Sequence, residues 1–194
     1  MGFTRAELES YRDTLVPDLI GPGCTLLVVG INPGLWTAAV GAHFARRGNR
    51  FYPALYEAGI VDRRIDASNG MSDDDRELLV SRGVGITNLA PRATARADEL
   101  TADELRAGRA RLHETVARVS PRVVAVLGIS AYRTAFGVPR ARVGKQDNDI
   151  EGVQLWVVPN PSGLNAHESV ATLARWYATA ARAAGISLLG SEGG

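Results

Sequence analysis

Short runs of apolar residues that stop at turn residues constrain the fold of this chain more than any other feature. Residues 26–29 form the first run, which stops at Gly30, and residues 84–89, 123–128 and 153–158 form three more. Apolar runs of this length, bounded by glycine, proline or asparagine, are typical of strands that are buried on both faces. We therefore expect four strands at the centre of the molecule.

Helical signals fill the segments between these runs. Thr4 with Glu7, and Thr101 with Glu104, have the spacing of a capping box, which predicts helices over residues 4–14 and 101–119. The spacing of apolar residues predicts further helices over residues 49–58, 130–136 and 168–184. Residues 62–82 are polar and irregular, with three consecutive acids at 73–75, and we interpret them as a surface excursion.

Strands that alternate with helices predict an α/β fold of three layers, α/β/α, in which helices cover both faces of a short, mainly parallel central sheet. The length of 194 residues and the hydrophobic content of 45% fit one domain over residues 1–194. Residues 190–194 are expected to form a disordered tail.

Composition excludes several classes of function. A single cysteine, Cys24, allows neither an internal disulfide nor a cysteine-ligated iron–sulfur cluster. His43, His113 and His167 lack the spacing of metal ligands, so we expect no metal and no cofactor. The polar N-terminus lacks the apolar core of a signal peptide, and no apolar run is long enough for a membrane span, which predicts a cytoplasmic protein. The net charge of +1 neither indicates nor excludes binding to nucleic acid.

Ligands of open parallel sheets bind beyond the carboxyl ends of the strands. In this chain the rule points to residues 30–44, residues 88–94, the turn after Leu127, and residues 160–167. The first and last of these segments are richer in glycine, proline and asparagine than a simple connection requires.

Three motifs in these segments carry a family resemblance. GINPG at 30–34, GNRFY at 48–52 and NPSGLN at 160–165 resemble the mismatch-specific uracil-DNA glycosylases, relatives of the thymine-DNA glycosylases within the uracil-DNA glycosylase superfamily. The resemblance extends over about residues 26–173. It implies a monomeric base-excision repair enzyme that flips uracil out of double-stranded DNA, with thymine and modified cytosine as further candidate substrates and a preference for a base opposite guanine. Hydrolysis of the N-glycosidic bond then leaves an abasic site.

The first motif supplies the candidate catalytic residue, Asn32. An amide is a poor base, but it can orient a water molecule, and water readily captures an oxocarbenium-like sugar. The resemblance assigns this role to Asn32 and places Gly30, Ile31, Pro33 and Gly34 around the substrate. The alternative is that Asn32 only caps a turn.

Four further residues complete the expected substrate pocket. The resemblance implies that Phe44 stacks on the flipped base, although sequence alone equally allows a core position. Asn88 can face a pyrimidine edge or can be a turn residue, and some bacterial relatives have lysine here. His43 resembles a histidine of thymine-specific relatives, but a solvated loop position is the stronger expectation. Asn160 opens the last motif.

The last motif is expected to bind DNA. By resemblance, Leu164 enters the duplex and fills the gap that the flipped base leaves, whereas the alternative places it in the core. The other residues expected to contact DNA are Ser162, Gly163, Asn165, His167 and Arg50. Arg46 and Arg47 lie close to Arg50, and Arg140, Arg142 and Lys145 form a second basic group that could hold phosphates.

Two other classes of function stay open at this stage. Because Lys145 is the only lysine, no Schiff-base lyase step is expected, and the main hypothesis is a monofunctional glycosylase. The first alternative is a damage- or mismatch-binding DNA module with weak or no activity. The second is a nucleotide-binding enzyme, although the chain lacks both G-x-G-x-x-G and a P-loop. The preferred lesion and the opposing base are not determined by the sequence.

Overall fold

The computed structural model describes residues 2–190, and they form a three-layer α/β structure. Its sheet has the strand order β2-β1-β3-β5-β4, formed by β1 (Leu26–Gly30), β2 (Val84–Asn88), β3 (Val123–Leu127), β4 (Gly144–Ile150) and β5 (Val153–Val158). Four strands are parallel, and β4 pairs antiparallel with β5 at one edge. The expected fold class is therefore confirmed, while most of the predicted tail, residues 191–194, lies outside the described residues.

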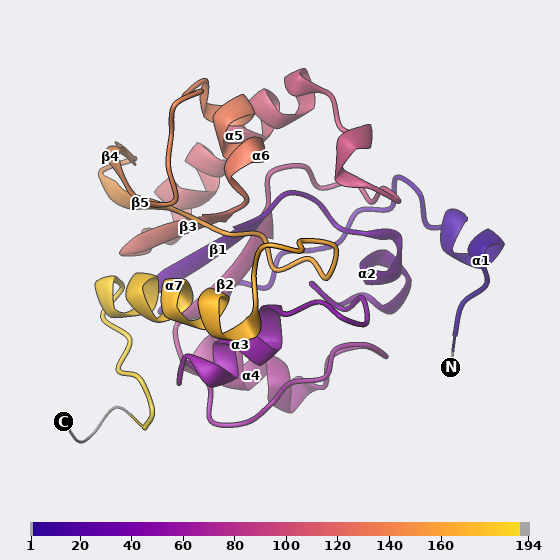
Figure 1. Ribbon diagram of the computed structural model, residues 1–194, viewed down its shortest axis with the longest axis horizontal. Coiled ribbons are helices and arrows are strands. Elements are labelled where there is room, and N and C mark those ends of the chain that lie inside the picture. Colours follow the sequence, from indigo (N-terminus) through magenta and orange to yellow (C-terminus); the bar gives the residue numbers. More distant parts are fainter. Residues whose placement is uncertain (1, 191–194) are drawn as a thin grey trace.

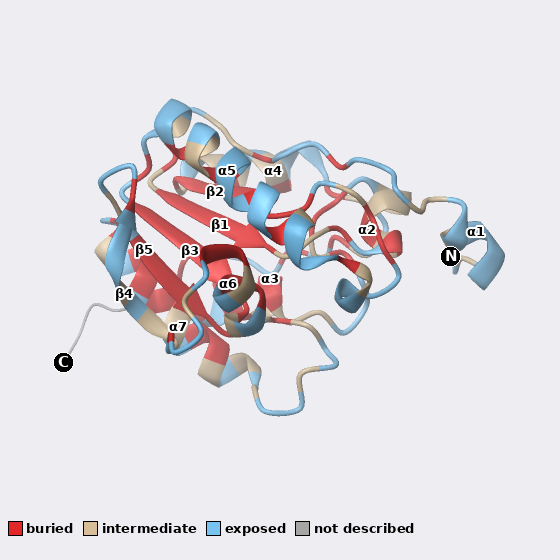
Figure 2. Cartoon of the chain, turned by 90° about the horizontal axis from the view of Figure 1, so that it is seen from above, coloured by how far each residue is buried: buried red, intermediate tan, exposed pale blue. Residues whose placement is uncertain are grey.

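Two groups of helices cover the two faces of the sheet (Figure 1). One layer contains α3 (Phe51–Glu57), α4 (Asp73–Ser81) and α7 (Val170–Ala183), and the other contains α5 (Ala102–Val119) and α6 (Ile129–Phe136). Strand residues alternate between the layers: Val28 packs towards α3 and α7, whereas Leu27 and Val29 pack towards α5 and α6. Figure 2 shows that burial is concentrated in the strands and in the inner faces of these helices.

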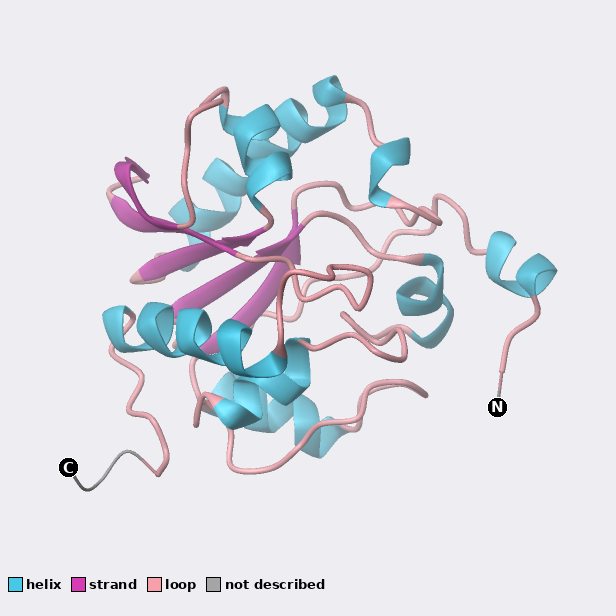
Figure 3. Cartoon of the chain, viewed as in Figure 1, coloured by secondary structure: helices cyan, strands magenta, loops and turns pink. Residues whose placement is uncertain are grey.

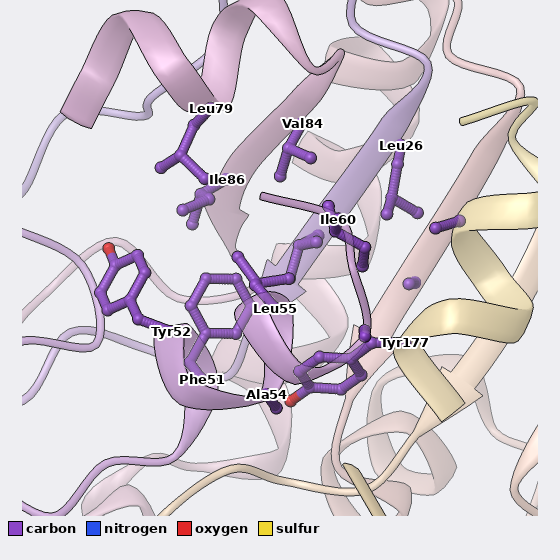
Figure 4. Packing of buried hydrophobic residues seen from close by; sticks show 14 of the residues in the cluster. Leu26, Phe51, Tyr52, Ala54, Leu55, Ile60, Leu79, Val84, Ile86 and Tyr177 are labelled. Atoms are coloured by element: carbon purple, nitrogen blue, oxygen red, sulfur yellow. The ribbon is translucent and has the colours of Figure 1, made fainter. Parts of the chain in front are cut away.

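The core beneath α3 is rich in aromatic residues. Phe51 is fully buried and lies against Tyr177 of α7, with ring centroids 5.9 Å apart. Leu55 and Ile60 fill the space between these rings and the sheet (Figure 4). Since Phe51 is the first residue of α3, this packing fixes the position of the loop that precedes the helix.

Two α-helices and one strand were not expected from the sequence. Helix α4 lies inside the supposed surface excursion, where Ser72 caps it through Asp75 N and the three acids occupy its first turn, a favourable position at the positive end of a helix. Helix α2 (Leu35–Val40) lies inside the expected loop 30–44. Strand β4 is polar and half exposed, as edge strands often are, so it has no apolar alternation to detect.

The N-terminal helix is shorter than predicted. Helix α1 covers Arg5–Glu9 instead of residues 4–14, although the predicted capping box between Thr4 and Glu7 is present. The chain leaves the helix after Ser10, and Asp13 adopts a positive φ of 61°. Helix α1 contains no buried residue and lies outside both helix layers (Figures 1 and 3).

Candidate active site

A cavity of about 160 Å³ lies where the parallel strands end. Gly30 and Asn88 end β1 and β2, Leu127 ends β3, and Asn160 follows β5. The next two strands along the chain, β2 and β3, lie on opposite sides of β1, so the strand order reverses at β1. Open α/β sheets bind ligands at such a reversal. The volume is below the range of about 300–1,000 Å³ for pockets of drug-sized ligands, and it suits a single small ring.

The structure brings together all nine residues that the sequence predicted for catalysis and substrate binding. They line the cavity in four segments: Gly30, Ile31, Asn32, Pro33 and Gly34; His43 and Phe44; Asn88; and Asn160. Of the predicted DNA-binding residues, Ser162 also lines the cavity. Thr94 and Arg96 also line the cavity from the loop after β2; the sequence pointed to the segment 88–94 but did not single out Thr94, and it did not indicate Arg96.

The side chain of Asn32 is held in one orientation by the loop after β2. Its Nδ2 donates to Thr94 Oγ1 at 2.8 Å and to the carbonyl oxygens of Arg92 and Pro33, each at 3.1 Å. These acceptors identify the amide nitrogen, so Oδ1 is the atom left without a hydrogen bond among the described residues. The amide therefore offers a fixed acceptor in the cavity wall rather than merely capping its own turn.

Arg92 in turn fixes the loop that holds Asn32. Its guanidinium donates to Glu104 at 2.5 Å, to Asp13 at 2.9 Å and to the carbonyl of Glu99 at 3.3 Å. Arg92 lowers the pKa of Glu104 to about 2, so Glu104 stays ionised and paired with Arg92 at neutral and mildly acidic pH. Asp13 lies 79 residues from Arg92, and the nearer partners Glu99 and Glu104 form no recognisable motif with it, so the sequence did not indicate these contacts.

Gly30, Asn88 and His43 form one side of the cavity. A Cβ at Gly30 would lie 2.4 Å from Asn88 Oδ1, so only glycine leaves room for this amide. His43 Nε2 lies 2.9 Å from the carbonyl oxygen of Pro17, which can only accept, and Asn88 Nδ2 lies 3.3 Å from His43 Nδ1. Nε2 therefore carries the proton, and Nδ1 accepts from Asn88.

The expectation that His43 is a solvated loop residue is wrong. Its side chain is buried, with an exposed fraction of 4%. Burial lowers the pKa of His43 below its ordinary value of 6.5, which favours the neutral ring that this hydrogen-bond pattern requires. His43 is thus a structural partner of Asn88 at the cavity wall.

Phe44 presents an aromatic ring to the cavity from a strained backbone. Its φ of 54° is unusual for a residue other than glycine, and such strain is often found at functional sites. The ring packs against Phe51, with centroids 4.1 Å apart and an interplanar angle of 32°. Phe44 is half-buried rather than part of the core, and the core ring behind it fixes its position.

The segment of residues 160–167, hereafter the wedge loop, projects from the edge of the cavity. Leu164 has an exposed fraction of 78%, so the alternative that it folds back into the core is wrong. Asn165 Nδ2 donates to the Asn160 carbonyl at 3.1 Å, and the Asn165 side chain therefore shapes the loop itself. A Cβ at Gly163 would lie 2.7 Å from the Gly48 carbonyl oxygen, so this close approach requires glycine.

Arg50, which directly precedes α3, holds the wedge loop through hydrogen bonds to its backbone. Its guanidinium donates to the carbonyl oxygens of Asn165 at 2.9 Å, of Gly163 at 3.2 Å and of Glu168, and its backbone N–H donates to Pro161. The side chain that the sequence assigned to DNA thus contacts the protein. His167 is exposed and does not line the cavity, and neither do Arg140, Arg142 and Lys145.

Within residues 2–190, no three His, Cys, Asp or Glu side chains meet in an arrangement that could hold a metal ion. The same part of the chain contains no helix with the length and apolar character needed to cross a membrane.

Comparison with known proteins identifies a family and a similar fold. The model of the uracil DNA glycosylase superfamily matches residues 17–182. Among solved structures, the chain is similar to the solution structure of a protein from Methanosarcina acetivorans that is provisionally assigned as a uracil DNA glycosylase. The sequences are 14% identical, and the match has a TM-score of 0.59 and covers 89% of this chain and 98% of the other. At this identity the second likeness concerns the fold alone.

Proposed function

Because the chain belongs to the uracil DNA glycosylase superfamily, we propose that it is a monofunctional glycosylase that excises uracil from double-stranded DNA. It would act as a monomer, flip the base into the cavity, hydrolyse the N-glycosidic bond and leave an abasic site. We further propose that it belongs to the mismatch-specific branch and prefers a base opposite guanine.

The orientation of Asn32 carries this proposal. With Nδ2 bonded to Arg92 and Thr94, Oδ1 can accept a hydrogen bond from a water molecule and direct the oxygen lone pair of that water into the cavity. An amide cannot remove the proton in advance. The chemistry must therefore depend on departure of the base, which leaves an electron-poor sugar that neutral water attacks, with the proton lost afterwards.

The cavity offers the contacts that a flipped pyrimidine needs. Phe44 can stack on the ring, an interaction worth about 1–3 kcal/mol per base. Asn88 uses one N–H on His43 and keeps Oδ1 and its second N–H for the polar edge of the base. Hydrogen bonds to the leaving base stabilise the negative charge that develops as the glycosidic bond breaks.

The wedge loop suits the flipping step. Base extrusion costs a few kcal/mol and is least costly at a mismatch, so a group that fills the vacated space holds the base outside. Leu164 is apolar and exposed, and its backbone is held by Arg50. No lysine lines the cavity, because the only one in the sequence is Lys145 of β4, which supports hydrolysis without a lyase step.

The test is base release from duplexes that each carry one defined lesion: uracil or thymine opposite guanine, uracil opposite adenine, and a modified cytosine, with a single-stranded control. We expect release of free uracil, fastest opposite guanine, with abasic strands that break only after alkali. Salt-dependent binding to mismatched duplex without release of any base would instead support the alternative of a damage-binding module. Equal rates opposite guanine and adenine would contradict the mismatch preference alone.

A further inference from the structure

An open groove of about 900 Å³ lies beside the cavity, on the side of helix α1. One wall comes from residues 3–15, hereafter the N-terminal arm, and contributes Arg5 and Arg12. The opposite wall contains Trp36 of α2 with Arg46 and Arg47, and Arg96 completes the lining near the cavity. The family match begins at residue 17, so family membership assigns nothing to the arm.

The groove is continuous with the cavity. Gly34, Arg46, Ala95 and Arg96 line both spaces. A polymeric ligand that places one group in the cavity and continues on this side therefore enters the groove. A free base or nucleoside would end inside the cavity and would not reach it.

The charge of the groove favours a polyanion. Its two acids, Glu9 and Glu99, both form ion pairs with Arg12, which neutralises part of their charge. Arg96 pairs with Asp98, but both side chains are largely exposed, and such pairs are weak. Within residues 2–190, the side chains of Arg5, Arg46 and Arg47 form no hydrogen bond or ion pair, and Asp66 acts on Arg47 only as a more distant charge, so all three guanidinium groups can bind phosphates.

The arm is fixed in place before any ligand arrives. Phe3 packs edge-on against Trp36, with ring centroids 5.0 Å apart. Asp13 N donates to the Ala93 carbonyl at 2.9 Å, Ala93 N donates to the Thr14 carbonyl at 3.0 Å, and Asp13 pairs with Arg92. The same loop orients Asn32 through Thr94, so the groove wall has a defined position relative to the reacting bond.

We propose that this groove binds the phosphodiester backbone of the strand that carries the excised base, on one side of the flipped nucleotide. The N-terminal arm is its outer wall, with Arg5 and Arg47 on opposite sides of the phosphates. This inference rests on the proposed function, since it requires that the cavity holds a base that is still part of a strand.

The experiment compares the full chain with the double variant Arg5→Gln/Arg47→Gln, neither residue of which lines the cavity. The matched control is Arg118→Gln/Arg175→Gln, which also removes two exposed arginines. Arg118 lies in α5 and Arg175 in α7, and neither residue lines the groove. Binding to a duplex with one uracil–guanine pair is measured by fluorescence anisotropy at several salt concentrations. Each lost phosphate contact lowers the slope of log K against log salt by about 1.

We expect a slope lower by about 1–2 and a binding constant about tenfold weaker for the groove variant, with the control close to wild type. In wild type, a lesion strand shortened so that only one nucleotide is left on the groove side of the uracil should show the same lower slope and weaker binding. A lesion strand shortened so that only one nucleotide is left on the opposite side of the uracil should not. The groove variant should be insensitive to the first shortening. A slope unchanged in the groove variant, or equal losses in groove and control variants, would overturn the proposal. Because these readouts measure binding, a chain that bound as expected but released no uracil would contradict the proposed function and not the groove.

Discussion

The loops that follow β1 and β5 reach the same edge of the sheet, but they are held in opposite ways. After β1, the side chain of Asn32 is itself bonded to a neighbouring loop through Nδ2, and within residues 2–190 its amide oxygen has no hydrogen-bond partner. After β5, the side chain of Leu164 is free and the backbone around it is held, through three carbonyl oxygens, by Arg50. The contrast fits two tasks: a group that places water must be fixed before the reaction, whereas a group that enters a duplex must be exposed on a fixed backbone.

Removal of the fixed amide should have the largest effect. We expect Asn32→Ala to lower single-turnover release of uracil at least about 100-fold, while binding to lesion-containing duplex stays close to wild type, because the role proposed for this amide is to place water and not to anchor phosphate. Rapid-quench release assays and anisotropy measure the two quantities. Thr94→Val, which removes one acceptor for Nδ2, should lose less activity. Near-wild-type release by Asn32→Ala would overturn its assignment.

Truncation of the exposed leucine should have a large effect on duplex DNA only. We expect Leu164→Ala to reduce excision about tenfold or more in duplex, because the extruded state is no longer held open. The loss should be much smaller on a single strand or a bulge that wild type cleaves measurably. Since Leu164 is 78% exposed, its truncation should leave the melting temperature nearly unchanged. A destabilised variant with an unchanged duplex-to-single-strand ratio would contradict the wedge.

Loosening the backbone beneath the wedge should have a smaller effect of the same kind. Arg50→Met removes three charge-assisted hydrogen bonds, two to the wedge loop and one to Glu168 directly after it, and we expect about a five- to tenfold loss on duplex. Arg50→Lys, which keeps the charge and some of these bonds, should recover part of the activity. If the two variants instead lose activity equally on duplex and single-stranded DNA, Arg50 supports folding in general and not the wedge.

The same contrast explains how much the sequence could predict. Asn32 and Asn88 could be placed at the cavity because they stand at or just after the ends of strands, and strand ends meet at one edge whatever the rest of the chain does. Phe44 lies outside the motifs and was placed there by the family resemblance alone. Helix α4 was missed although Ser72 and Asp75 have N-cap spacing, since its polar surface lacks the expected apolar pattern. Arg50 was assigned to DNA because its carbonyl partners Gly163, Asn165 and Glu168 lie 113–118 residues away along the chain. Arg92 was overlooked because its partner Asp13 lies 79 residues away, and its nearer partners Glu99 and Glu104 form no recognisable motif with it.

Asn88 offers a way to sharpen the description of the cavity. We expect Asn88→Ala to change the ratio of activities on uracil and on thymine opposite guanine by about fivefold, the value of one net hydrogen bond. Chemistry itself should persist, because Asn32 and its partners are untouched. The measurement is single-turnover release from both duplexes under identical conditions. An equal fall on both substrates would mean that Asn88 supports the cavity without selecting the base.

The smallest effect concerns the proton on His43, which keeps Asn88 in its orientation. Burial lowers the pKa of His43 in the folded chain below the ordinary 6.5, so between these two values the unfolded state binds more protons than the folded state. The contribution of His43 to stability is therefore complete above pH 6.5 and is lost as the pH falls below it, with a slope of at most about 1.4 kcal/mol per pH unit.

A variant that cannot titrate separates this effect from other groups. We expect His43→Gln, whose amide can still donate to Pro17, to lose less stability between pH 7 and pH 5 than wild type, as measured by denaturant unfolding at each pH. Asp18 and Arg76, the charged groups that act on His43, are common to both proteins and cancel in the difference. In wild type, protonation places a second N–H against Asn88 Nδ2, so the uracil-to-thymine ratio should change over the same pH range, whereas in His43→Gln it should stay constant. Parallel pH profiles for the two proteins would show that His43 does not control the orientation of Asn88.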